Sequence, residues 1–170
     1  MMSAQVGNKI PDGSFPYIPY TPGLADGKSC GVPSKVTTDD WKGKRVVIFA
    51  VPGAFTPTCH VSHLPGFVSK YDELKAKGVD VIACLASNDH WVMSGWGRVE
   101  GVEDKILMLS DVDGAWSEKL GLKRPDGRTK RYAIIIDDLV IKSLEVSWHA
   151  LFLSQIAMDT ALMRILGGKG

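Results

Sequence analysis

An unbroken apolar run that leads into a cysteine-bearing turn and then into a helix-like segment constrains the fold of this chain more than any other feature. The run is Val46–Val51, the cysteine is Cys59, and apolar residues at helical spacing follow over 61–77. A run that is apolar at every position is typical of a strand buried on both faces of a sheet. The sequence therefore predicts an α/β arrangement with Cys59 at the junction of a buried strand and a helix.

Cys59 occupies a position at which a thiol can become a reactive thiolate. The free N–H groups of a helix N-terminus point at the sulfur, and the helix dipole favours negative charge there. A thiolate attacks electrophiles, including peroxides and disulfides. A lone cysteine is more often buried and inert, so position alone leaves both interpretations open.

The residues around Cys59 resemble the active-site signature of a known family. Pro52, Thr56 and Cys59 form the pattern Pro-x-x-x-Thr-x-x-Cys of the peroxiredoxins, which are thiol peroxidases. The longer string PGAFTPTCHVSHLPGF is similar to the type II group, the peroxiredoxin 5 subfamily with its fungal-type alkyl hydroperoxide reductases. The resemblance runs from about Val6 to Glu145, and three further segments match in the same order: 75–84, 87–89 and 130–133.

The resemblance implies a thioredoxin-like fold, with a mixed central β-sheet flanked by helices in three α/β/α layers. No linker, repeat or low-complexity stretch interrupts the chain, so residues 1–170 are expected to form one domain. The family uses no metal or other cofactor. Cys59, His60 and His63 could suggest zinc, but the spacing lacks a fourth ligand, so metal binding is not expected. His60 is expected near the pocket entrance and His63 as a packed helix residue.

The resemblance also implies roles for four residues. Cys59 is the peroxidatic nucleophile, Pro52 walls the site, and Arg131 lies beside the sulfur and keeps it ionised. An arginine at the start of a buried strand agrees with this, because a charge there is costly unless it is paired or functional. Thr56 lies three residues before Cys59, where its hydroxyl can bind a peroxide, cap the helix, or do both. Solvated surface charges are expected at three other cations: Arg124, Arg128 and Lys130.

Attack on a peroxide leaves a sulfenic acid, which condenses with a second thiol. Cys30 lies in a loop, and fungal-type members resolve with a loop cysteine of the partner subunit, so Cys30 is the first candidate. Cys84 lies in an apolar strand, where a core role is more common, and is the second candidate. The remaining alternative is that neither cysteine resolves. The region 144–151 contains no cysteine, which excludes the late-loop mechanism of many type II members.

Periodicity and turn residues indicate the other elements. The first forty or so residues are rich in proline, glycine and tyrosine and predict turns with short strands. A helix is expected over 57–76, capped by Thr56 or Thr58 and kinked at Pro65. Asp137 and Asp138 indicate a hairpin turn. Further strands are expected at 45–51, 79–86, 106–109, 131–136 and 139–146, and further helices at 89–99, 115–120 and 151–166.

Composition excludes several classes of protein. The 20 basic and 19 acidic residues nearly cancel and form no run of one sign, so neither nucleic acid nor a membrane surface is expected as a partner. No apolar run approaches the roughly 20 residues of a membrane span. No secretory pattern or peroxisomal Ser-Lys-Leu tail is recognised, so the cytoplasm is expected, with peroxisomal or mitochondrial pools left open.

The activity implied by the resemblance is reduction of hydrogen peroxide and small alkyl hydroperoxides. Electrons would come from thioredoxin, or from glutaredoxin with glutathione. The family also implies a homodimer, with Phe55, Trp91 and Trp96 as a candidate apolar contact patch. Core packing is the alternative for the two tryptophans. Two alternatives use the same residues differently: a peroxide sensor that passes a disulfide to partner proteins, and a non-catalytic binding protein.

Overall fold

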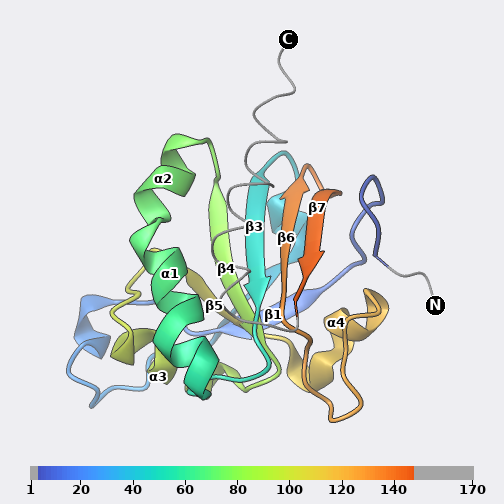
Figure 1. Ribbon diagram of the computed structural model, residues 1–170. Helices are drawn as coiled ribbons and strands as arrows, with labels where there is room; N and C mark the ends of the chain where they lie inside the picture. Colours follow the sequence, from blue (N-terminus) through green and yellow to red (C-terminus); the bar gives the residue numbers. More distant parts are fainter. Residues whose placement is uncertain (1–3, 148–170) are drawn as a thin grey trace.

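A five-stranded mixed sheet forms the centre of the molecule, with β3 (Arg45–Ala50) as its middle strand. The computed structural model describes residues 4–147 (Figure 1). β3 pairs in parallel with β4 and antiparallel with β6, so parallel and antiparallel pairing meet at its two edges. The sheet confirms the predicted fold class, and its order is β5 (Leu107–Ser110), β4 (Val81–Ala86), β3, β6 (Tyr132–Asp137) and β7 (Val140–Val146).

Helices and a short hairpin cover the two faces of this sheet. One face packs against the wide turn η3 (Cys59–His63) and three helices, α1 (Leu64–Ser69), α2 (Tyr71–Ala76) and α3 (His90–Val99). The other face packs against α4 (Ala115–Lys119) and the amino-terminal segment. That segment and the link before α4 contain β1 (Ser14–Tyr17), η1 (Pro22–Leu24), β2 (Ser34–Thr37), η2 (Thr38–Trp41) and η4 (Val112–Gly114).

The alternation of side chains along β3 explains its continuous apolar sequence. Val47 and Phe49 point to the side of α1 and α3, whereas Val46 and Ile48 belong to the cluster on the opposite side. All four are at most 3% exposed, because helices or the amino-terminal segment cover both faces. The prediction of a doubly buried strand is therefore confirmed.

Most of the remaining predicted elements are present, with shifted ends. Asp89 caps α3 as predicted, since its Oδ1 accepts hydrogen bonds from the N–H groups of Trp91 at 2.8 Å and Val92 at 3.0 Å. The hairpin turn falls one residue later than predicted, at Asp138 and Leu139, both of which have positive φ angles. β6 also begins one residue later than predicted, so Arg131 lies just before the strand rather than inside it.

The helix that carries Cys59 differs from its prediction in three ways. Its first turn is widened to a π-helix, in which the N–H of Leu64 donates to the carbonyl of Cys59. Pro65 then stands at the start of α1, where its missing N–H costs little, and the interruption falls at Lys70 instead. Neither Thr56 nor Thr58 forms a side-chain capping bond. The helix predicted at 151–166 lies outside the described residues.

Candidate active site

The chain between β3 and the helix places Cys59 beyond the carboxyl end of the middle strand, with no exposed surface. β3 stops pairing with β6 at Ala50, opposite Tyr132. The N–H of Ala54 donates to the side-chain oxygen of Asn88 at 2.8 Å, which ties the turn to the segment after β4. This hydrogen bond holds the turn against the segment that follows β4, and the Cys59 side chain is buried beneath the turn.

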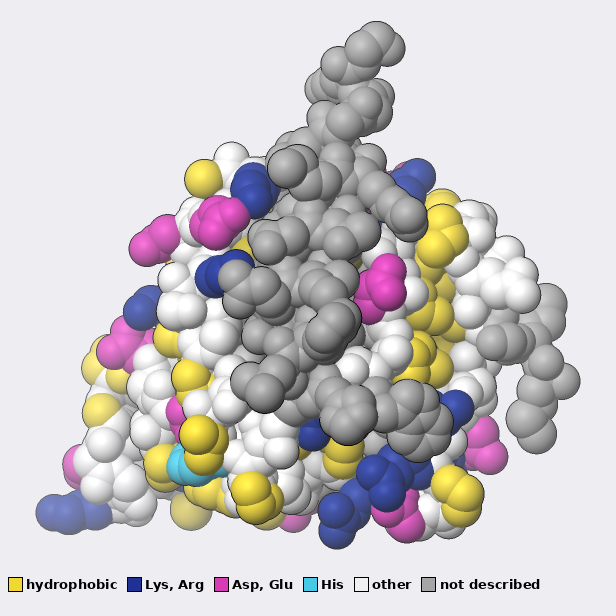
Figure 2. Space-filling view, in the orientation of Figure 1, with side chains coloured by type: hydrophobic (Ala, Val, Ile, Leu, Met, Phe, Trp, Pro, Cys, Tyr) yellow, Lys and Arg dark blue, Asp and Glu magenta, His cyan; other side chains and the backbone are white. Residues whose placement is uncertain are grey.

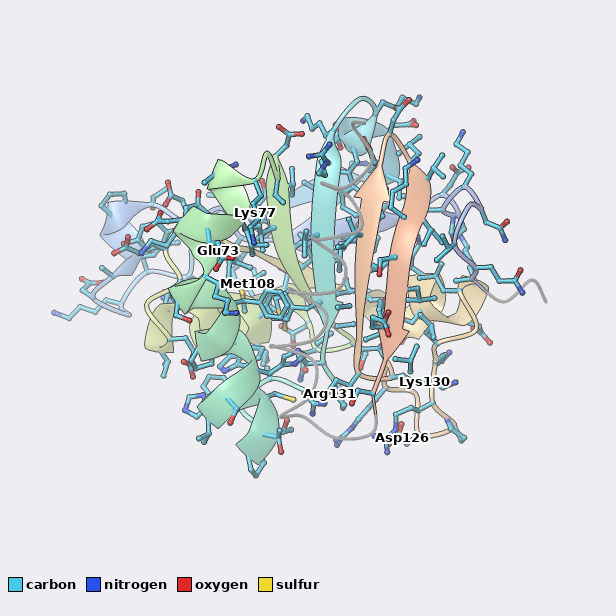
Figure 3. All side chains as sticks on the ribbon, turned by 45° about the horizontal axis from the view of Figure 1, so that its top comes forward. Glu73, Lys77, Met108, Asp126, Lys130 and Arg131 are labelled. Atoms are coloured by element: carbon cyan, nitrogen blue, oxygen red, sulfur yellow. The ribbon has the colours of Figure 1, made fainter. Side chains whose placement is uncertain are left out.

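Arg131 brings a permanent positive charge to the sulfur. Its Nη2 donates to Cys59 Sγ at 3.2 Å, although the two residues are 72 positions apart. The strand register explains this contact, because Ala50 lies opposite Tyr132 and the neighbouring Arg131 therefore lies beside the turn that follows β3. Figure 3 shows Arg131 at the foot of β6, on the side of the helical layer. A fixed guanidinium at this distance places a permanent positive charge and a hydrogen-bond donor directly at the sulfur.

His63 holds the other side of the guanidinium. Its Nδ1 lies 3.0 Å from Nη1 of Arg131, and its ring packs against Phe49 and Phe67. Burial, and to a lesser extent the charge of Arg131, lowers the pKa of His63 to about 3. The ring is therefore neutral at ordinary pH, and Nδ1 can accept a hydrogen bond from the arginine. His63 was predicted as a packed residue, and this second contact was missed.

Thr56 and Pro52 lie on the solvent side of the same turn. The hydroxyl of Thr56 donates to the carbonyl of Gly53 at 2.8 Å, so its oxygen still has lone pairs that can accept a hydrogen bond. Pro52 and Arg131 line a pocket of about 420 Å³ together. A small molecule in this pocket would therefore meet two of the residues around Cys59, Pro52 and Arg131.

His60 links the first helical turn to α3. The Nε1 of Trp96 donates to Nδ1 of His60 at 3.1 Å, and the same nitrogen contacts the carboxylate of Glu100. Trp96 has no exposed surface, so its predicted place in an exposed dimer patch is wrong. Its large ring is needed to fill the core beneath the turn. Phe55 and Trp91 are exposed, at 49% and 43%.

The two other cysteines have opposite environments. Cys84 is fully buried in β4, and burial, followed by the proximity of Cys59, raises its pKa well above the usual value. Cys30 is exposed in the loop after η1. Arg98 fastens this loop to α3, because its Nη1 donates to the carbonyl of Ser29 at 3.0 Å and to that of Leu24 at 3.4 Å. No disulfide joins the three cysteines.

Residues 4–147 contain no group of three His, Cys, Asp or Glu side chains placed to hold a metal ion. None of the helices between these residues is both long and apolar enough to cross a membrane.

Sequence reasoning missed two residues that position the site, His63 and Asn88. Both lie within segments that resemble the family, and this position was the only indication in the sequence that they could belong to the site. Their roles depend on contacts with Arg131 and Ala54, which are distant in the sequence.

Comparison with known proteins gives a consistent result. The sequence model described as Redoxin matches residues 5–148. Peroxiredoxin AHP1 of Chaetomium thermophilum is 40% identical, over 100% of this chain and 99% of its own length. Peroxiredoxin Pen c 3 of Penicillium citrinum is 42% identical, over 91% of this chain and 95% of its own. The reduced Prx3 of Vibrio vulnificus in complex with H2O2 superposes with a TM-score of 0.73 at 39% identity, covering 86% of this chain and 89% of that one.

Proposed function

The chain belongs to the redoxin family and is a peroxiredoxin, and from this premise we propose that it reduces hydrogen peroxide and small alkyl hydroperoxides through Cys59. The thiolate attacks the terminal oxygen of the peroxide. An S–O bond forms and the O–O bond breaks, so sulfur is oxidised to a sulfenic acid. The leaving oxygen takes up a proton and departs as water or as an alcohol.

The observation that carries this proposal is the contact between Arg131 and the Cys59 sulfur. The guanidinium donates to the sulfur and can stabilise the negative charge that develops on the leaving oxygen during attack. The Thr56 hydroxyl can accept a hydrogen bond from the peroxide, and Pro52 would form a wall of the reaction centre. Cys59→Ser is expected to abolish peroxide consumption, and residual turnover in that variant would contradict the assignment.

We assign Cys30 of a partner subunit as the resolving thiol, with Cys84 as the second candidate. Cys30 is exposed and can meet another subunit, whereas Cys84 is buried and its raised pKa disfavours the nucleophilic thiolate. Condensation of the sulfenic acid with this thiol forms the disulfide and releases water. Because Cys59 itself is fully buried, its turn must open before any disulfide can form.

Peptide mapping without a reducing agent tests this assignment. Fully reduced protein is treated with an equimolar amount of hydrogen peroxide, digested and analysed by mass spectrometry. A Cys59–Cys30 link together with a dimer band supports resolution between subunits. A Cys59–Cys84 link, or an oxidised Cys59 with both other thiols free, overturns it.

The proposal extends to the reductant, the assembly and the compartment. Thioredoxin, or glutaredoxin with glutathione, would reduce the disulfide, and the exposed Phe55 and Trp91 are available for a homodimer contact. Residence in the cytoplasm is part of the same proposal. A peroxide sensor would use the same cysteine, and it is distinguished by mixed disulfides with other proteins in place of turnover with thioredoxin.

A further inference from the structure

The pocket beside Arg131 extends well beyond the cysteine. Pro52 and Arg131 connect it to the reacting sulfur, because both line the pocket and Arg131 contacts Cys59. The other described lining residues come from the segment between α4 and β6 and from the end of β7 and the residue after it: Arg124, Pro125, Lys130, Val146 and Ser147. The pocket therefore joins the reaction centre to a surface built by a distant part of the chain.

The volume of this pocket, about 420 Å³, is much larger than hydrogen peroxide requires. A water molecule takes up roughly 30 Å³ in the liquid, and hydrogen peroxide has only one more oxygen atom. Pockets of roughly 300 to 1,000 Å³ are typical of sites for organic ligands. The pocket consequently has room for the organic group of a hydroperoxide next to its peroxide group.

The walls and the rim differ in character. Pro52, Pro125 and Val146 supply apolar walls, and Val146 is 44% exposed. The rim is basic, and the described lining residues include no Asp or Glu. Figure 2 shows Lys and Arg side chains gathered at the foot of the molecule. A ligand with a hydrocarbon part and an anionic end would match both surfaces.

Two of the cations at the rim retain capacity for a new anion. Arg124 pairs with Asp126 at 3.0 Å, but both side chains are nearly half exposed, and such pairs contribute little. Lys130 Nζ donates to the carbonyl of Gly121 at 3.3 Å, which leaves two of its three donors. Figure 3 shows Lys130 and Asp126 close to Arg131 at this end of the sheet.

We propose that this pocket selects organic hydroperoxides that carry a carboxylate, with the peroxide at Cys59 and the carboxylate at Arg124 and Lys130. The inference rests on the proposed peroxidase function and adds a substrate class to it. The balance of the reaction is unchanged: the S–O bond forms, the O–O bond breaks, and the organic product is a hydroxy acid. The carboxylate takes no part in the bond changes and serves only for binding.

The test compares two hydroperoxides that share one carbon skeleton, cumene hydroperoxide and its para-carboxylated derivative. Fully reduced protein is mixed with each probe, and loss of the Cys59 thiol is followed by rapid quenching and mass spectrometry. The rate ratio of the carboxylated to the neutral probe is expected to be about tenfold, the size that two partly exposed cations can supply. The ratio is also expected to shrink as salt is added.

The double variant Arg124→Gln with Lys130→Gln is expected to bring this ratio to about one. The matched control is Lys35→Gln with Lys105→Gln, which removes the same charge from exposed positions that do not line the pocket and should preserve the ratio. If both probes oxidise Cys59 at the same rate, or if the double variant keeps the wild-type ratio, this inference is wrong and the peroxidase proposal stands. If no peroxide oxidises Cys59, both are wrong.

Discussion

The buried histidine beside Arg131 predicts a specific loss of stability in acid. His63 has a pKa of about 3 in the folded protein, because burial penalises its charged form, whereas an unfolded histidine titrates near 6.5. Between these two values the unfolded chain binds a proton that the folded protein does not. Stability should therefore be fully present above pH 6.5 and fall as the pH drops towards 3.

The size of this effect follows from the difference between the two pKa values. Each unit corresponds to about 1.4 kcal/mol, so His63 alone should cost about 5 kcal/mol over the whole window. At about pH 4.5 the loss should be about 2 to 3 kcal/mol relative to pH 7.5. That is a large fraction of the roughly 5–15 kcal/mol by which a domain of this kind is stable.

Urea unfolding of the wild type and of His63→Asn, at about pH 7.5 and pH 4.5, measures this effect. Asparagine cannot titrate, yet its side-chain oxygen can still accept from Arg131. The wild type should lose about 2 to 3 kcal/mol more than the variant on acidification. Equal losses would refute the reasoning, as would an NMR titration that shows the folded His63 ring protonating near pH 6.5. The NMR titration needs only wild-type protein and so does not depend on folding of the variant.

Three further predictions concern the site and its support. Arg131→Lys should slow Cys59 oxidation about ten- to a hundredfold in stopped-flow mixing, because lysine lacks the planar fork that reaches both sulfur and His63, and an unchanged rate would contradict this. Cys30→Ser should abolish the peroxide-induced dimer band on a non-reducing gel while Cys84→Ala keeps it, and the reverse pattern would move the resolving role to Cys84. Phe67→Ala should lower the urea-derived free energy of unfolding by about 3–5 kcal/mol, since its ring stacks on Phe49 at 3.9 Å, and a loss below about 1 kcal/mol would show that this stack contributes little.

The sequence predicted features that depend on neighbours in the chain. The apolar run of β3 and the Asp89 cap of α3 follow from local periodicity and local hydrogen bonding, and both are present. The strand ends were less accurate, as the hairpin turn at Asp138 and Leu139 shows, because those ends depend on pairing with another strand. The widened turn at Cys59 and the break at Lys70 were also missed, since helical spacing does not reveal how a helix packs.

The signature around Cys59 was readable because its members lie within eight positions of each other. By itself, the sequence determined that a cysteine would stand at the start of a helix behind a buried strand, with Pro52 and Thr56 beside it. The family resemblance had already placed Arg131 beside the sulfur, and the tertiary structure gave the contact as a hydrogen bond from the guanidinium. Only the tertiary structure decided that neutral His63 holds the arginine and that Trp96 is core rather than surface. The physical reason is the range of the interactions. Neighbours in the sequence set the backbone conformation, whereas the pairing of β3 with β6 decides which side chains from distant parts of the chain meet.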